Sequence, residues 1–167
     1  MENKTKKVAF LGLCTAVTLI LAYVEAILPP LWSAVPGIKM GLPNIMILFL
    51  LYRFSFKEAA AVSLVRLLAV ALLFGNIMTL AYSVAGAGLS LGIMVLLKKT
   101  DRFSMVGVSI TGGIFHNLGQ ILVAMLVLET AEIGYYMIIL TLTGTVAGIL
   151  VGFAGFLVLK YLKKAKI

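Results

Sequence analysis

Long apolar runs, separated by short polar or charged clusters, make up almost the whole chain. No stretch alternates apolar and polar residues at every second position, as a half-buried strand would. A helix needs about 20 residues to cross the hydrocarbon core of a bilayer, with a range of about 17 to 25. The runs predict an all-helical bundle of six membrane-spanning segments, at residues 8–28, 38–52, 58–74, 76–97, 103–128 and 132–162.

The second of these segments fits a membrane span least well. Pro29, Pro30 and Pro36 exclude a continuous helix through the stretch before it, because proline lacks a backbone N–H and fixes its φ angle. Residues 38–52 are few for a span and include Pro43. We therefore expect either an adapted span or a partly broken helix here.

Composition indicates that the bilayer surrounds the chain. Of 167 residues, 62% are hydrophobic and 12% charged, against about a quarter charged in soluble domains, and the mean hydropathy is +1.15. A soluble globule of this composition would expose large apolar patches. A soluble enzyme, a disordered tail and a nucleic-acid-binding module are therefore excluded, and the length predicts a single domain, 1–167.

The positions of the basic residues predict the orientation. The chain has 14 Lys and Arg residues. All of them except Lys39 and Arg66 lie before the first segment, between the second and third, between the fourth and fifth, or near the end of the sixth and after it. These places share one side of a six-span bundle. By the positive-inside rule both termini are expected in the cytoplasm. The net charge of +8 then reflects topology and predicts no nucleic-acid partner.

Three charged residues remain at membrane depth. Arg66 lies near the middle of the third segment, Lys39 at the outer start of the second, and Glu25 near the outer end of the first. An arginine at the bilayer centre costs about 2.5–3.5 kcal/mol on insertion scales. Such a residue is expected to be paired or to have a function.

The fifth segment has the densest group of polar residues. His116, Asn117 and Gln120 share one helical face with Gly113, because residues three and four apart lie on the same side of a helix. Asn44 comes to a similar depth. These polar residues and the three charged residues at membrane depth predict one outward-opening pocket that favours an anionic group. Its predicted lining residues are Glu25, Lys39, Asn44, Arg66, His116, Asn117 and Gln120.

Structural roles remain open for these residues. Arg66 can pair with Glu25 or with helix carbonyls as a structural staple, and Lys39 can anchor the interface by extending outward. Asn117 and Gln120 can form hydrogen bonds between helices. A single histidine in a bundle is more often structural than catalytic.

Residue types needed for catalysis or cofactor binding are missing. The chain has no phosphate-binding glycine loop, no paired carboxylates for magnesium, and one Cys and one His, too few for a zinc site. We therefore expect a binding protein without enzymatic activity, cofactor or metal. Cys14 is expected to be a small buried residue without an internal disulfide.

Small residues four apart occur in three segments. They are Gly144, Gly148 and Gly152 in the sixth, Gly88 and Gly92 in the fourth, and Gly12 and Ala16 in the first. This spacing lets helix backbones approach closely in a membrane. It favours either packing within the bundle or docking of another protein.

Three motifs carry a resemblance to a known family. They are Pro36-Gly37-Ile38-Lys39-Met40-Gly41-Leu42-Pro43-Asn44-Ile45, then Arg66-Leu67-Leu68 with Phe74-Gly75, and Gly113 with His116-Asn117-Leu118-Gly119-Gln120. In this order they are similar to motifs of the Gx transporter family, also labelled heptaprenyl diphosphate synthase component I. That family in turn resembles the substrate-binding S components of energy-coupling factor (ECF) transporters, which are six-helix membrane proteins.

The resemblance implies a function in uptake at the plasma membrane. The chain would take up a small, anionic or polar, vitamin-like or precursor molecule from outside the cell. A transmembrane coupling subunit and two cytoplasmic ATPases would then reorient it, with Ala9, Gly12 and Ala16 as the counterpart of the docking face on the first helix. The alternative is a non-catalytic membrane accessory subunit of a prenyl diphosphate synthase or an isoprenoid or quinone pathway.

Overall fold

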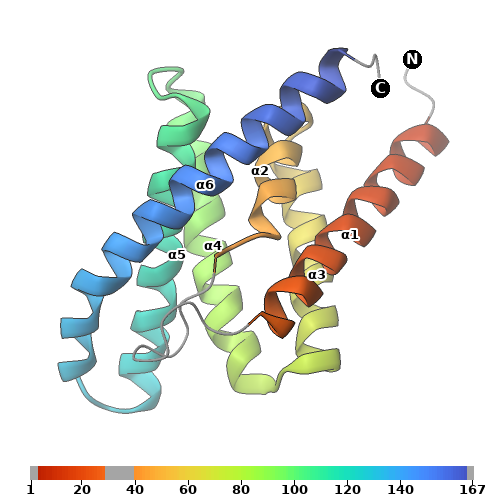
Figure 1. The fold of residues 1–167 in the computed structure, drawn as a ribbon. Coiled ribbons are helices and arrows are strands. Elements are labelled where there is room, and N and C mark those ends of the chain that lie inside the picture. Colours follow the sequence, from red (N-terminus) through yellow and green to blue (C-terminus); the bar gives the residue numbers. More distant parts are fainter. Residues whose placement is uncertain (1–3, 29–39, 165–167) are drawn as a thin grey trace.

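The computed structural model describes residues 4–28 and 40–164, whose regular structure is helical throughout (Figure 1). The elements are α1 (Lys4–Ile27), α2 (Asn44–Arg53), α3 (Phe56–Phe74), α4 (Ile77–Lys99), α5 (Met105–Val127), the short 3-10 helix η1 (Glu132–Tyr135) and α6 (Tyr136–Lys164). Five of the six predicted segments agree with an observed helix to within about one helical turn. The second segment differs.

Polar residues just before three helices determine where those helices begin. The Ser55 hydroxyl accepts a hydrogen bond from the Lys57 N–H at the start of α3, and Ser104 does the same at the start of α5. Asn76 and Thr79 form a reciprocal capping box at the start of α4. Each of these side chains satisfies N–H groups that have no partner within the helix.

The long helices run up and down the bundle (Figure 1). Helices α4, α5 and α6 pack most extensively, α5 lying between the other two, while α1 packs mainly on α3 and α2 lies between α3 and α6. The start of α1, the α2–α3 and α4–α5 connections and the end of α6 lie at the same end. The basic clusters of the described residues therefore gather at one end of the bundle. Which side of a membrane this end faces stays a prediction.

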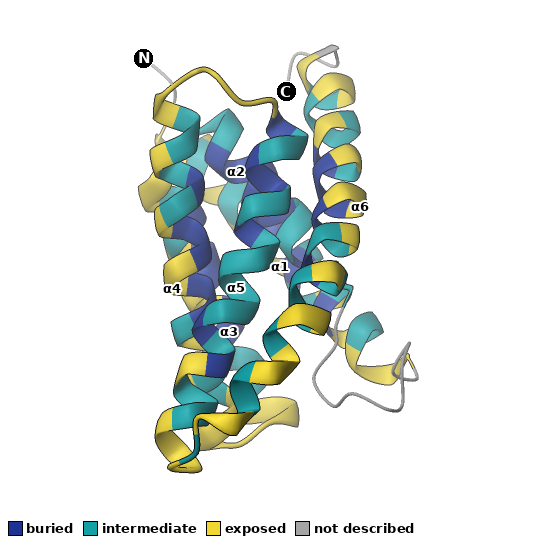
Figure 2. Ribbon diagram, turned by 90° about the vertical axis from the view of Figure 1, so that its left-hand side faces the viewer, coloured by how far each residue is buried: buried dark blue, intermediate teal, exposed yellow. Residues whose placement is uncertain are grey.

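Helix α2 is enclosed by the other helices, and for the segment predicted at 38–52 it fits the alternative of a partly broken helix. It has 10 residues, about 15 Å at about 1.5 Å per residue, so it is too short to cross a membrane alone. Pro43 directly precedes the helix with φ −60°, which suits proline at a helix start. Residues 46–51 are all buried, and Figure 2 shows this concentration of burial. A helix that is apolar on every side is expected inside a bundle.

The outer surface of the described bundle is apolar. Four stretches are long and apolar enough to cross a membrane: Lys4–Ile27, Ile77–Lys99, Met105–Val127 and Glu132–Lys163. Large apolar side chains point outward, such as Leu72 and Leu126, which are 87% and 79% exposed. Patches of this kind are typical of surfaces that face lipid. The chain is therefore a helical membrane protein.

Glycines determine how closely α4, α5 and α6 approach. A Cβ added at Gly148 would lie 2.5 Å from Ile110 Cα, and one at Gly119 would lie 2.6 Å from the Ala85 carbonyl oxygen. Only the absence of a side chain permits these contacts. The packing interpretation is confirmed for the glycines of the sixth segment, Gly144, Gly148 and Gly152.

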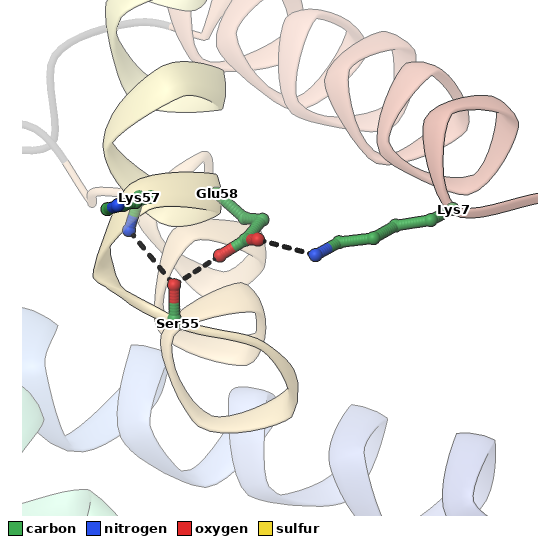
Figure 3. A network of polar contacts seen from close by, with 4 residues as sticks. All are labelled: Lys7, Ser55, Lys57 and Glu58. Atoms are coloured by element: carbon green, nitrogen blue, oxygen red, sulfur yellow. Dashed lines mark hydrogen bonds and ion pairs between the residues drawn. The ribbon is translucent and has the colours of Figure 1, made fainter. Parts of the chain in front are cut away.

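A polar contact joins α1 to α3 at the basic end of the bundle (Figure 3). Lys7 Nζ lies 2.6 Å from Glu58 Oε1. The Ser55 hydroxyl donates a hydrogen bond to the other Glu58 oxygen and accepts one of 3.2 Å from the Lys57 N–H. The residues that begin α3 thus also hold the first turns of α1.

Candidate ligand-binding cavity

A cavity of about 130 Å³ lies within the bundle, and all six α-helices contribute to its wall. Six of the seven predicted substrate-binding residues line it: Glu25, Asn44, Arg66, His116, Asn117 and Gln120. The seventh, Lys39, lies outside the described residues. The structure thus brings together residues from α1, α2, α3 and α5, as the matching depths predicted. Their role in binding substrate stays a prediction.

Arg66 is the buried cation of this cavity. It lies in the middle of α3 and is 9% exposed, and its Nε is buried without a hydrogen-bond partner. Glu25 acts on it electrostatically, but no carboxylate oxygen of the described residues lies within 4.0 Å of its guanidinium. The direct ion pair that would make Arg66 a structural staple is therefore not formed in the described part of the chain.

Glu25 holds the turn that leads into α2. Its Oε1 accepts hydrogen bonds from the backbone N–H groups of Gly41 and Leu42. Gly41 has φ +75°, a conformation that glycine adopts without steric cost. Met40, Gly41 and Pro43 also line the cavity. Glu25 therefore fixes part of the cavity wall while its carboxylate borders the same space.

The polar face of α5 lies against α4 and α6. Asn117 Nδ2 donates a 2.7 Å hydrogen bond to the Leu140 carbonyl oxygen of α6, so it has the interhelical bond that its structural interpretation predicted. A Cβ at Gly144 would lie 2.9 Å from this nitrogen. On the α4 side, a Cβ at Gly86 would lie 3.1 Å from both His116 Cε1 and Gln120 Cγ. Glycines on both neighbouring helices make room for these polar side chains.

Three serines of the cavity wall, Ser83, Ser90 and Ser109, were not among the predicted site residues. Ser90 of α4 and Ser109 of α5 are buried and line the cavity. Hydroxyl residues in membrane helices often bond back to their own helix, as Thr18 does to the Cys14 carbonyl, so serine alone gives no clear signal. Ser90 lies four residues after Gly86 and therefore on the same face of α4, the face that packs closely on α5. This spacing is the signal in the sequence that could have identified Ser90.

The described wall of the cavity offers charge and hydrogen bonds more than stacking surfaces. No Phe, Tyr or Trp of the described residues lines it. Nor do three His, Cys, Asp or Glu side chains come together as a metal site anywhere in residues 4–28 and 40–164. The arrangement can surround a small polar group and neutralise its charge.

Comparison with known proteins gives a family. No curated protein and no solved structure matches the chain significantly. The model of one family, described as heptaprenyl diphosphate synthase component I, matches residues 14–158. This match extends from the middle of α1 to the last turns of α6, so it covers α2 to α5 completely and α1 and α6 in part. The chain therefore belongs to the heptaprenyl diphosphate synthase component I family.

Proposed function

We propose that this protein captures a small polar or anionic molecule, a vitamin-like compound or a precursor, in the cavity around Arg66. It would do so at the plasma membrane, from the outside, as the substrate-binding subunit of an uptake system similar to an ECF S component. The observation that carries the proposal is the buried Arg66 guanidinium, which borders the cavity with an unpartnered Nε.

The energetics of Arg66 support a ligand-binding role. A cation in the middle of a membrane helix is costly unless it is paired or reaches water, and a buried donor without a partner adds about 1–3 kcal/mol. Carboxylates and phosphates suit a guanidinium because they accept two parallel hydrogen bonds. A bound anionic group would supply the partner that the described protein groups do not give to Nε.

The same cavity supports binding without chemical transformation. Its described wall combines the Arg66 cation, amides and hydroxyl groups but has no paired carboxylates. Glu25, the carboxylate of this wall, is engaged by the backbone of Gly41 and Leu42. We therefore treat the protein as a non-enzymatic subunit.

An exposed face of α1 supports docking of a coupling subunit. Ala9, Gly12 and Ala16 are exposed on this helix, and a Cβ at Gly12 would meet no atom within 4 Å. Small residues leave room for the close approach of another helix. In the proposed system a transmembrane coupling subunit binds this face and two cytoplasmic ATPases drive transport, with both termini of this chain in the cytoplasm.

Native mass spectrometry of gently extracted protein tests the proposal. We expect wild type to retain a small molecule and Arg66→Gln to lose it. Arg66→Lys should retain less than wild type, because lysine keeps the positive charge but cannot donate two parallel hydrogen bonds as the planar guanidinium does. Lys160→Gln removes one exposed positive charge at the end of α6 and serves as the control. Thermal unfolding of each variant separates loss of ligand from loss of fold. Full retention in folded Arg66→Gln would remove Arg66 from the site.

The family description favours a second candidate, an accessory subunit of a prenyl diphosphate synthase. The cavity of about 130 Å³ can enclose only a small group of such a lipid, because an apolar cavity of about 150 Å³ is of a size that binds benzene. This candidate predicts copurification of a soluble synthase from native membranes and no affinity for an extracellular solute. Uptake predicts copurification of ATPases together with solute binding.

A further inference from the structure

We infer that the ligand of this cavity is a compact, non-aromatic zwitterion, whose anionic group meets Arg66 and whose cationic group meets Glu25. The inference rests on the proposed function and specifies its substrate class. It follows from three properties of the described cavity wall: the charges that border it, its size, and the kind of side chains that complete it.

The described wall has one arginine, Arg66, and one carboxylate, Glu25. Arg66 and Glu25 both line the cavity and interact electrostatically, yet no ion pair within 4.0 Å joins them among the described residues. A simple anion would neutralise Arg66 and leave the Glu25 carboxylate as an unpaired negative charge. A zwitterion placed between the two residues pairs both charges, and in a poorly solvated site each unpaired charge is costly.

Glu25 is held in place for this role. Its Oε1 accepts hydrogen bonds from the Gly41 and Leu42 N–H groups, which hold the carboxylate in one orientation. A carboxylate has about four acceptor sites in all, so a ligand ammonium group can still bind it. Arg66, in turn, presents an Nε that has no hydrogen-bond partner among the described residues.

The size and the remaining wall select a compact ligand. About 130 Å³ is close to the volume that encloses a benzene-sized molecule. Among the described residues of the wall, His116 brings the one aromatic ring, without any Phe, Tyr or Trp, and buried Ser90 and Ser109 bring hydroxyl groups. Such a wall suits a short, flexible, hydrogen-bonding molecule better than an aromatic heterocycle.

Three probe molecules of similar size test the inference by thermal-shift titration of the purified full chain. They are β-alanine, butyrate, which replaces the ammonium group by a methyl group, and butylamine, which lacks the carboxylate. We expect β-alanine to bind about tenfold or more tightly than butyrate or butylamine, because butyrate leaves half-buried Glu25 without a cationic partner and butylamine leaves buried Arg66 without an anionic one.

The variant Glu25→Gln separates the charge of Glu25 from its structural role, since glutamine keeps an oxygen that can accept from Gly41 and Leu42. We expect this variant to bind butyrate at least as well as β-alanine. Butyrate binding that equals β-alanine binding in wild type, or an unchanged preference in Glu25→Gln, would overturn the inference. So would the absence of binding by all three probes at millimolar concentration.

The retained molecule found by native mass spectrometry distinguishes this inference from the proposed function. A retained molecule with both a cationic and an anionic group supports both. A retained anion without a cationic group, lost in Arg66→Gln, overturns the zwitterion and leaves the proposed function standing. If wild type retains no small molecule and binds none of the probes, both fail.

Discussion

Between α5 and α6, a Cβ at Gly148 would lie 2.5 Å from Ile110 Cα, whereas on α1 a Cβ at Gly12 would meet no atom within 4 Å. Both glycines belong to small-residue motifs with four-residue spacing. The first motif brings two helices of the same chain together, and the second leaves an open surface. The comparison teaches that small residues four apart indicate a surface for a closely packed helix. The spacing does not tell whether that helix belongs to the same chain or to another protein.

The two regions also differ in what holds them in place. Helices α4, α5 and α6 meet along most of their length through glycine contacts. Helix α1 is held by larger side chains and by charge: Phe10 packs against Phe49, Tyr23 against Phe74, and Lys7 pairs with Glu58. Substitutions at glycines should therefore damage the α5–α6 contact and spare α1.

The largest effect on stability is expected from Gly148→Ala. Its methyl group would overlap the backbone of α5 at Ile110, and overpacking of this kind costs about 1–3 kcal/mol or more. Gly88→Ala is the matched control, because a Cβ there meets no atom within 4 Å. We expect thermal unfolding in detergent to show a large loss for Gly148→Ala and no loss for Gly88→Ala. Equal melting temperatures would show that α5 and α6 do not pack this closely.

A smaller effect is expected from Asn117→Ala. It removes the hydrogen bond to the Leu140 carbonyl oxygen of α6, and such interhelical bonds contribute about 0.6 kcal/mol on average, up to about 1.7. Thr111→Val is the control, since the bond that the Thr111 hydroxyl makes among the described residues stays within its own helix, to the Gly107 carbonyl oxygen. Unfolding by denaturant measures both. If Asn117→Ala costs no more than Thr111→Val, this bond does not help to hold α5 on α6.

A still smaller effect is expected where α1 meets α3. Glu58→Gln breaks the ion pair with Lys7, whose side chain is 36% exposed while that of Glu58 is 17% exposed. Partly exposed pairs contribute about 0–1 kcal/mol and weaken with salt. A double-mutant cycle with Lys7→Met, measured at low and high salt, checks this. A coupling energy that is large or independent of salt would contradict the interpretation.

No effect on stability is expected from Gly12→Leu, because the added side chain would meet open space. Under the proposed function it blocks the docking face of α1, so copurification of the coupling subunit should be lost while ligand binding remains. Gly88→Leu provides the comparison, since it adds the same bulk to an equally open place on α4. Loss of the partner in both variants, or in neither, would argue against docking through α1.

Much of the fold could be predicted from hydropathy and from the residues that cap helices. The five long helices follow apolar runs, and Ser55, Asn76 and Ser104 mark three helix starts. In the second segment the structure has a 10-residue helix, which fits the alternative of a partly broken helix. Pro43 indicated a break, but no local pattern showed that the helix begins only at Asn44, or that the Lys98 amine bonds to the Leu51 carbonyl oxygen near its end.

The candidate site could be predicted in part, because charged and amide side chains are rare at membrane depth. That rarity led to the six described residues that line the cavity, Arg66 among them. Ser90 and Ser109 were missed, since serine is common in membrane helices. The hydrogen bond from Asn117 to Leu140 also depends on a helix pairing that no local pattern encodes.

The sequence by itself determined that this is a helical membrane protein with buried charge, since hydropathy, capping and charge clusters are properties of neighbouring residues. Only the tertiary structure decided which glycines pack, that α2 is enclosed, and that Arg66 and Glu25 border one cavity without a direct ion pair. The physical reason is that lipid chains are as apolar as leucine. A helix face that meets lipid and one that meets another helix can therefore carry the same residues.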